Sequence, residues 1–79
     1  MTIDGALKEL RGNETNIRFV RLIRMVTMFF GSPRIKGSHY IFKTPWPGDP
    51  RINLQKEKGK AKYYQVLQVI SALEKLKGS

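Results

Sequence analysis

A two-residue turn at Gly37 and Ser38 constrains the fold more than any other feature of this 79-residue chain. Apolar and basic residues alternate on both sides of it, and this period of two predicts extended strands. A glycine at the first position of such a turn takes a positive φ without steric cost. The sequence therefore predicts a tight antiparallel hairpin in which Lys36 faces His39, the only histidine of the chain.

The hairpin is predicted to belong to a sheet of three antiparallel strands, from Arg34 to Lys36, from Ser38 to Thr44 and from Arg51 to Gln55. The intervening segment Pro45-Trp46-Pro47-Gly48-Asp49-Pro50 contains too many turn-forming residues to continue a ladder, so we expect a loop. Trp46 in this loop has two interpretations. It stacks on a nucleic-acid base, or it packs over the sheet edge, and the second is favoured.

Helical periodicity appears on both sides of the strands. Residues 1–12 include a short extra helix from Thr2 to Leu10, and a second helix capped by Asn13 or Thr15 is expected to reach about Met28. The last helix follows the connector 56–62. Its expected apolar stripe is Tyr63, Val66, Leu67, Ile70, Leu73 and Leu76. The apolar stripe expected in the second helix includes Ile17, Val20, Ile23 and Val26. Met25 and Met28 of the same helix are expected to fill the core.

The order of these elements predicts a single α+β domain over residues 1–79 with two layers. The second and last helices are expected to cover one face of the sheet. That face carries the apolar residues Ile35, Tyr40, Phe42, Ile52 and Leu54.

The charge balance indicates a polyanionic partner. Fifteen Lys and Arg residues against six Asp and Glu residues give a formal net charge of +9, and nucleic acid is the leading class of partner for such a chain. No apolar run approaches the roughly 20 residues of a membrane span, and no secretory leader is visible, so we expect a cytoplasmic protein. The absence of cysteine and the single histidine make a metal centre improbable, and no cofactor is expected.

The uncovered face of the predicted sheet brings His39 into a basic surrounding. Metal-free cleavage of RNA needs a base to take the ribose 2′-hydroxyl proton and cations to stabilise the charge that develops on phosphate. A neighbouring ammonium disfavours a charged imidazole, so we expect His39 to be neutral and able to accept a proton. A lone histidine is by itself more often structural than catalytic. The residues expected on this face are Arg34, Lys36, His39, Lys43, Arg51, Asn53 and Gln55.

Four alternating lysines precede the last helix. If the connector is extended, they line one of its sides and follow a phosphate backbone, although runs of charge are usually no more than solvated surface. The start of a helix also offers backbone N–H groups to anions. We therefore expect phosphate contacts from Lys56, Lys58, Lys60 and Lys62.

Three segments resemble the HicA toxins of bacterial toxin–antitoxin pairs: Gly37-Ser38-His39, Asn53-Leu54-Gln55 and Gly59-Lys60-Ala61-Lys62-Tyr63-Tyr64-Gln65. The resemblance extends from Asn16 onward. It implies a fold like that of a double-stranded RNA-binding domain, ribosome-independent cleavage of mRNA, a catalytic role for His39 and a supporting turn at Gly37 and Ser38. It also implies a HicB-like antitoxin protein as partner. Tyr63 departs from the proline expected in many relatives, which affects only how the helix begins.

Two other functions remain open at this stage. The same element order suits a non-catalytic module that binds double-stranded RNA, although such modules use a longer loop between the first two strands. A structural or protein-interaction domain whose charge serves only solubility is the third possibility. RNA cleavage separates the first function from the second, and a salt-dependent affinity for RNA separates both from the third.

Overall fold

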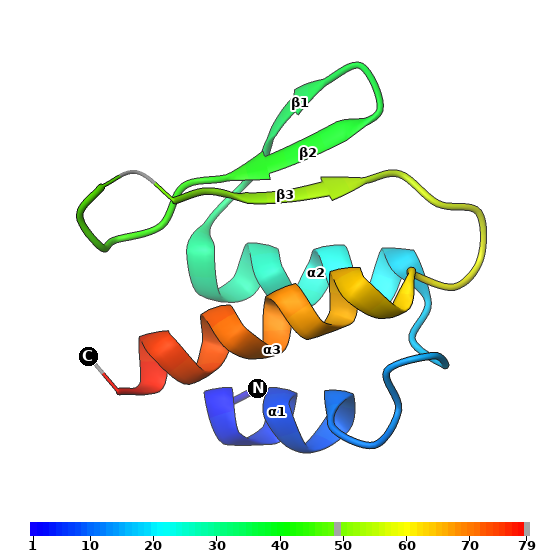
Figure 1. Cartoon of the computed structure of the whole chain (residues 1–79), viewed down its shortest axis with the longest axis horizontal. Coiled ribbons are helices and arrows are strands. Elements are labelled where there is room, and N and C mark those ends of the chain that lie inside the picture. The colour runs from blue at the N-terminus through cyan, green and yellow to red at the C-terminus, as the bar shows by residue number, and fades with distance from the viewer. Residues whose placement is uncertain (49, 79) are drawn as a thin grey trace.

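The computed structural model describes residues 1–48 and 50–78, and it confirms the α+β class and the single three-stranded antiparallel sheet with strand order β1-β2-β3 (Figure 1). Asp49, which belongs to the predicted loop 45–50, lies outside the described residues. The elements are α1 (Ile3–Leu10), α2 (Phe19–Phe30), β1 (Arg34–Lys36), β2 (His39–Phe42), β3 (Ile52–Gln55) and α3 (Tyr63–Lys77).

The hairpin forms as the sequence predicts. Gly37 has a φ of 61°, and Lys36 lies opposite His39 in the β1–β2 pairing. The second pairing places His39 opposite Gln55 and Ile41 opposite Asn53. Because β2 is the central strand, His39 stands between a residue of each outer strand. Strand β2 begins one residue later and ends two residues earlier than the predicted strand 38–44, and β3 begins one residue later than the predicted strand 51–55.

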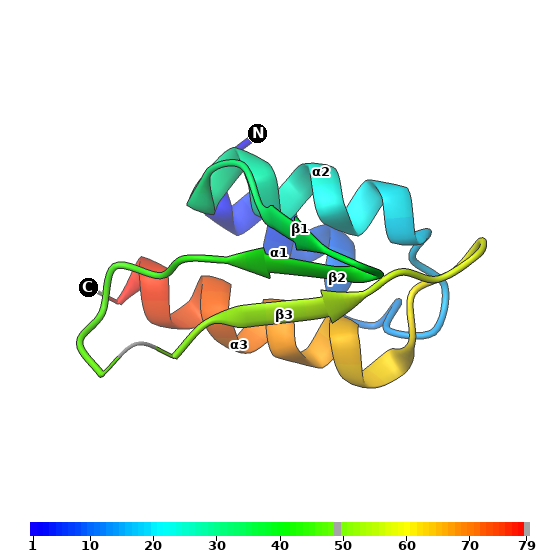
Figure 2. The ribbon, with the colours of Figure 1, turned by 90° about the horizontal axis from the view of Figure 1, so that it is seen from above.

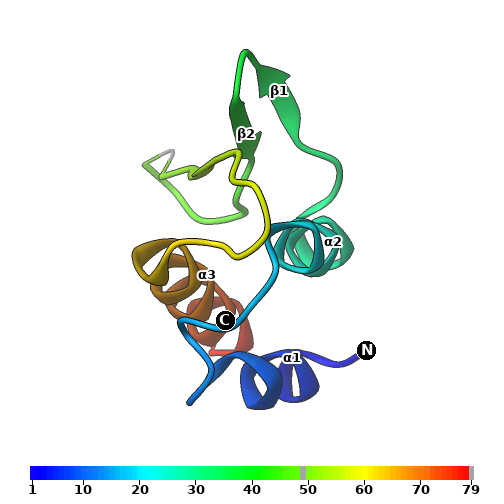
Figure 3. The ribbon, with the colours of Figure 1, turned by 90° about the vertical axis from the view of Figure 1, so that its right-hand side faces the viewer.

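Helices α2 and α3 lie side by side on one face of the sheet, where they bury Phe42, Ile52 and Leu54 (Figures 1 and 3). The predicted extra helix α1 begins at an N-cap where the Thr2 hydroxyl accepts from the Gly5 N–H. It packs against α3 on the side away from the sheet and buries Leu7 and Leu10 there. The molecule thus has three layers instead of the predicted two. Among the described residues, none of the helices has the length and apolar character needed to cross a bilayer.

The predicted start of α2 is wrong by three to five residues, because the N-cap is Arg18 and not Asn13 or Thr15. Asn13 does not cap this helix, because its side-chain amide donates to the carbonyl of Glu9 at the end of α1. The chain then turns through residues 14–16 and pairs around Arg18 with the connector before α3. The Phe19 N–H donates to the Gly59 carbonyl and the Ala61 N–H donates to the Ile17 carbonyl, both at 2.7 Å. At its other end α2 continues to Phe30, past the predicted Met28.

Some apolar residues predicted for the core are exposed. Ile35 is 60% exposed because β1 is a three-residue edge strand that rises beyond the reach of the helices (Figure 3). In α3 the buried arc is shifted, because this helix faces the sheet on one side and α1 on another: Val69 and Ala72 are buried and Tyr63 is not. The wrongly predicted core positions are Val20, Met28, Ile35, Tyr63 and Leu67.

Trp46 packs against the body of the protein, as the favoured interpretation held. Its ring meets Phe30 edge-on with the centroids 5.8 Å apart, and the Lys75 ammonium lies 4.7 Å from its centroid. These partners belong to α2 and α3, so the contact is made mainly with helices. Trp46 thereby closes the end of the core next to the loop between β2 and β3.

Candidate functional site

The sheet face opposite the helices is open to solvent, and Figure 2 looks down on it. Two rows of facing residues lie on it, Arg34–Ile41–Asn53 and Lys36–His39–Gln55. Beyond the strands, Lys43 and Arg51 line a hollow of about 480 Å³ together with Arg34. We call this surface the open sheet face; its polar members are all exposed and are those predicted, namely Arg34, Lys36, His39, Lys43, Arg51, Asn53 and Gln55.

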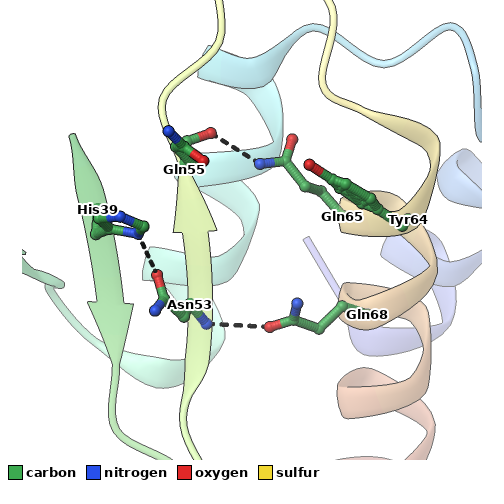
Figure 4. Close-up of a pocket in the computed structure, with 6 residues that line it drawn as sticks. All are labelled: His39, Asn53, Gln55, Tyr64, Gln65 and Gln68. Atoms are coloured by element: carbon green, nitrogen blue, oxygen red, sulfur yellow. Dashed lines mark hydrogen bonds between the residues drawn. The ribbon is translucent and has the colours of Figure 1, made fainter.

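His39 is held by a hydrogen bond from one ring nitrogen. Its Nδ1 lies 3.1 Å from Oδ1 of Asn53 on the neighbouring strand (Figure 4). An amide oxygen only accepts hydrogen bonds, so Nδ1 carries the proton and the lone pair of the neutral ring is at Nε2. This is the tautomer that a general base acting through Nε2 requires.

Two glutamines of α3 hold the outer edge of β3, and with it Asn53. Oε1 of Gln68 accepts from the Asn53 backbone N–H at 3.0 Å, and Nε2 of Gln65 donates to the Gln55 carbonyl at 2.8 Å (Figure 4). Gln65 is 3% exposed, and its Oε1 also accepts from the Lys62 N–H at the start of α3. These side chains satisfy backbone groups that a further strand would otherwise pair. Neither glutamine is among the predicted site residues, although their spacing of three residues beside the apolar positions of α3 was a signal for them in the sequence.

His39 borders two hollows. One, of about 280 Å³, extends over β3 toward α3, and the other, of about 420 Å³, extends toward the β1–β2 turn and is lined by Lys36, Gly37 and Ile41. The first brings together residues of all three segments noted in the sequence, and Tyr64, Gln65 and Gln68 line it without having been predicted as site residues. Its lining is His39, Asn53, Gln55, Tyr64, Gln65 and Gln68.

The turn at Gly37 and Ser38 is hydrogen-bonded to the connector 56–62. The carbonyl of Ser38 accepts from the Lys56 N–H at 2.7 Å, which extends the β2–β3 ladder by one bond. Gly37 adopts the positive φ that the turn needs, so a side chain at this position would be strained. The turn thus fixes the backbone immediately before His39.

The connector lysines are exposed but do not form one row. The chain bends at Lys58 and Gly59, where Gly59 has a φ of 73°, so the alternation of sides is interrupted. Lys60 pairs with Arg18 as an isolated bridge, and the ammonium of Lys62 lies 3.9 Å from a carboxylate oxygen of Glu57. The prediction of a straight lysine track is therefore wrong, because the connector must turn to pair with the segment before α2.

Carboxylates are concentrated away from the open sheet face. Glu9 of α1 accepts two hydrogen bonds from Arg21, and this guanidinium holds the pKa of Glu9 below its usual value. Asp4 pairs with Lys77 and Glu74 pairs with Arg11. Within residues 1–48 and 50–78, no three potential metal-ligating side chains come together. The open sheet face therefore presents cations, amides and one imidazole.

Comparison with models of known families, with curated proteins and with solved structures finds no match to this chain.

Proposed function

We propose that the protein is a metal-independent RNA endonuclease in which His39 is the general base. The observation that carries this proposal is the Nδ1 hydrogen bond to Asn53, which leaves Nε2 as the proton acceptor on an exposed basic surface. A base of this kind typically contributes a factor of about 10² to 10⁴ to a rate. The expected enzyme is modest, which suits a shallow site on a small domain.

In the proposed reaction Nε2 of His39 takes the proton of a ribose 2′-hydroxyl. The 2′ oxygen then forms a bond to the adjacent phosphorus while the bond from phosphorus to the 5′ oxygen breaks, and the leaving 5′ oxygen takes a proton from water, giving a 2′,3′-cyclic phosphate and a 5′-hydroxyl end. Lys36, opposite His39, and Arg34 in the neighbouring row are positioned to stabilise charge on the phosphate oxygens. Lys43, Arg51 and the connector lysines bind the flanking backbone.

The deciding experiment replaces His39 by alanine. Because the side chain is exposed, His39→Ala should keep the circular dichroism spectrum and melting temperature of the wild type. Cleavage of a labelled single-stranded RNA in the presence of EDTA should fall by about 10²-fold or more. Lys8→Ala, at an exposed position of α1, is the matched control and should cleave RNA as the wild type does. Cleavage retained by His39→Ala would remove this residue from the mechanism.

We further propose that this activity belongs to the toxin of a HicA-like toxin–antitoxin pair with a fold like that of a double-stranded RNA-binding domain. The convergence of the three HicA-like segments at His39 supports this, as does the α2-β1-β2-β3-α3 order. The target is cytoplasmic mRNA, and the partner is an acidic, HicB-like antitoxin that covers the open sheet face. Expression of the chain alone should arrest growth, expression of His39→Ala should not, and co-expression of the antitoxin should restore growth.

The alternative is a module that binds double-stranded RNA without cutting it. The exposed lysines before α3 favour it, because they add a second basic region beside the open sheet face. The two-residue turn between β1 and β2 is short for reaching a second groove. Under this alternative His39→Ala binds duplex RNA as the wild type does, and neither protein cleaves.

A further inference from the structure

The hollow between β3 and α3 differs in chemistry from the surface around it. Apart from His39, its lining consists of amide side chains and one tyrosine, while lysines and arginines occupy the rest of the open sheet face. Charged groups suit phosphate, whereas uncharged donors and a flat ring suit the edge and face of a nucleobase. The hollow is therefore the part of this surface whose groups match the chemistry of a base.

Internal hydrogen bonds occupy the oxygens of two amides that line this hollow and leave their nitrogens as donors, while the Gln55 side-chain amide, which makes no hydrogen bond with a described residue, offers a donor and an acceptor. The oxygen of the Asn53 amide is engaged by His39, and the oxygen of the Gln68 amide is engaged by the Asn53 N–H. Gln65 uses both ends of its amide within the protein. Among hydrogen bonds between described residues, none engages Nδ2 of Asn53 or Nε2 of Gln68, so both remain available to a ligand.

Tyr64 supplies an aromatic surface at the same place. It is 56% exposed at the start of α3, and it makes no ring contact with another described aromatic residue (Figure 4). An exposed ring at the edge of a polar hollow is a platform on which an unstacked base can lie. The amides of Asn53 and Gln68 and the exposed ring of Tyr64 thus border the same hollow as His39.

We infer that this hollow is a subsite for the nucleobase next to the cleaved phosphodiester, and that it prefers bases with a carbonyl at C4 or C6, uracil or guanine, over bases with an amino group there, adenine or cytosine. The donors Nδ2 of Asn53 and Nε2 of Gln68 match carbonyl oxygens, whereas adenine offers an amino group there. Tyr64 contributes affinity for any base. The inference rests on the proposed function for the location of the cut, but the base preference is measurable without cleavage.

The test uses Gln68→Glu and RNA that cannot be cut. A glutamate at this position keeps an oxygen for the Asn53 N–H and replaces the free donor by an acceptor. Binding of 2′-O-methyl oligouridine and oligoadenosine, which lack the nucleophilic hydroxyl, is measured by fluorescence anisotropy. The wild type should prefer oligouridine by about fivefold, the low end for a specific base contact, and Gln68→Glu should lose or invert this ratio.

Two controls separate charge and stacking from base reading. Ser71→Glu, an exposed position one turn further along α3, adds the same negative charge and should weaken both oligomers equally. Tyr64→Ala should weaken both by about fivefold or more, because stacking is tolerant of sequence. A wild-type ratio near one, a ratio unchanged in Gln68→Glu, or no binding at all overturns the subsite.

Cleavage of unmodified RNA of mixed sequence then separates the subsite from the enzyme. Cuts beside uracil or guanine that spread to adenine in Gln68→Glu support both proposals. A base-dependent affinity without any cleavage by the wild type leaves the subsite standing and overturns the endonuclease. Cleavage without base preference, together with equal affinities for the two oligomers, leaves the endonuclease standing and overturns the subsite.

Discussion

Charged side chains are paired more fully on the side of the molecule formed by α1, which we call the α1 side, than on the open sheet face. At α1 the carboxylates of Asp4, Glu9 and Glu74 each meet a cation on another segment. On the open sheet face Arg34, Lys36 and Lys43 form no ion pair with any described carboxylate. The cations Arg34, Lys36 and Lys43 are therefore not neutralised by a described carboxylate, whereas those that meet Asp4, Glu9 and Glu74 are.

A charge that serves only solubility does not require this difference. Cations that are close together repel one another and cost stability, while scattering them among the carboxylates would have served solubility equally well. Exposed ion pairs contribute little to folding, so the pairs at α1 mainly neutralise that side. The α1 side thus carries paired charges, whereas Arg34, Lys36 and Lys43 on the open sheet face have no described carboxylate partner.

The largest expected effect on stability tests whether packing, not charge, holds α1. Leu10 is fully buried against the core and Ile35 is 60% exposed, so the same kind of truncation is made in both regions. Leu10→Ala should lower the free energy of unfolding by about 2–5 kcal/mol, and Ile35→Ala by roughly 0.5 kcal/mol or less, as measured by urea denaturation. Equal losses in the two variants would contradict the division of roles.

An intermediate effect is expected for affinity when charge is reversed on either side. Lys36→Glu on the open sheet face should weaken RNA binding by about tenfold and reduce the slope of log K against log salt by about one or more, because a phosphate contact is lost. Lys8→Glu makes the same change at an exposed position of α1 and should leave the slope nearly unchanged. Similar losses in both variants, or an affinity independent of salt, would favour a domain whose charge serves only solubility.

Local patterns predicted the elements near the candidate site well. The hairpin at Gly37 follows from alternation and one glycine, both of which act within a few residues, and the His39 row follows from the same register. The α+β class and the helix covering of one sheet face follow from the element order. These are the features that depend least on contacts distant in sequence.

The errors occur where distant segments meet. The start of α2 was missed because residues 17–19 pair with residues 59–61, an arrangement no local cap signal encodes. The buried arc of α3 was shifted by its second neighbour, α1. The Asn53–His39 bond and the contacts of Gln65 and Gln68 with β3 join residues 10 to 15 positions apart, so the sequence supplied the residues of the hollow but not their hydrogen bonds.

The smallest expected effect is the pH dependence of the α1 contacts. Hydrogen bonds from Arg21 lower the pKa of Glu9 below 4.5 in the folded state, so its stabilising contribution is complete above the unfolded value and disappears as the pH falls through the lower folded value. Glu9→Gln should therefore be slightly less stable than the wild type at pH 7 and equally stable at a pH well below 4.5, when both are unfolded with urea. High salt should shrink the difference at pH 7, because the pair is partly exposed. A gap that persists at low pH would mean that Glu9 acts through packing, and the α1 side would then owe even less to charge than the comparison with the open sheet face assumes.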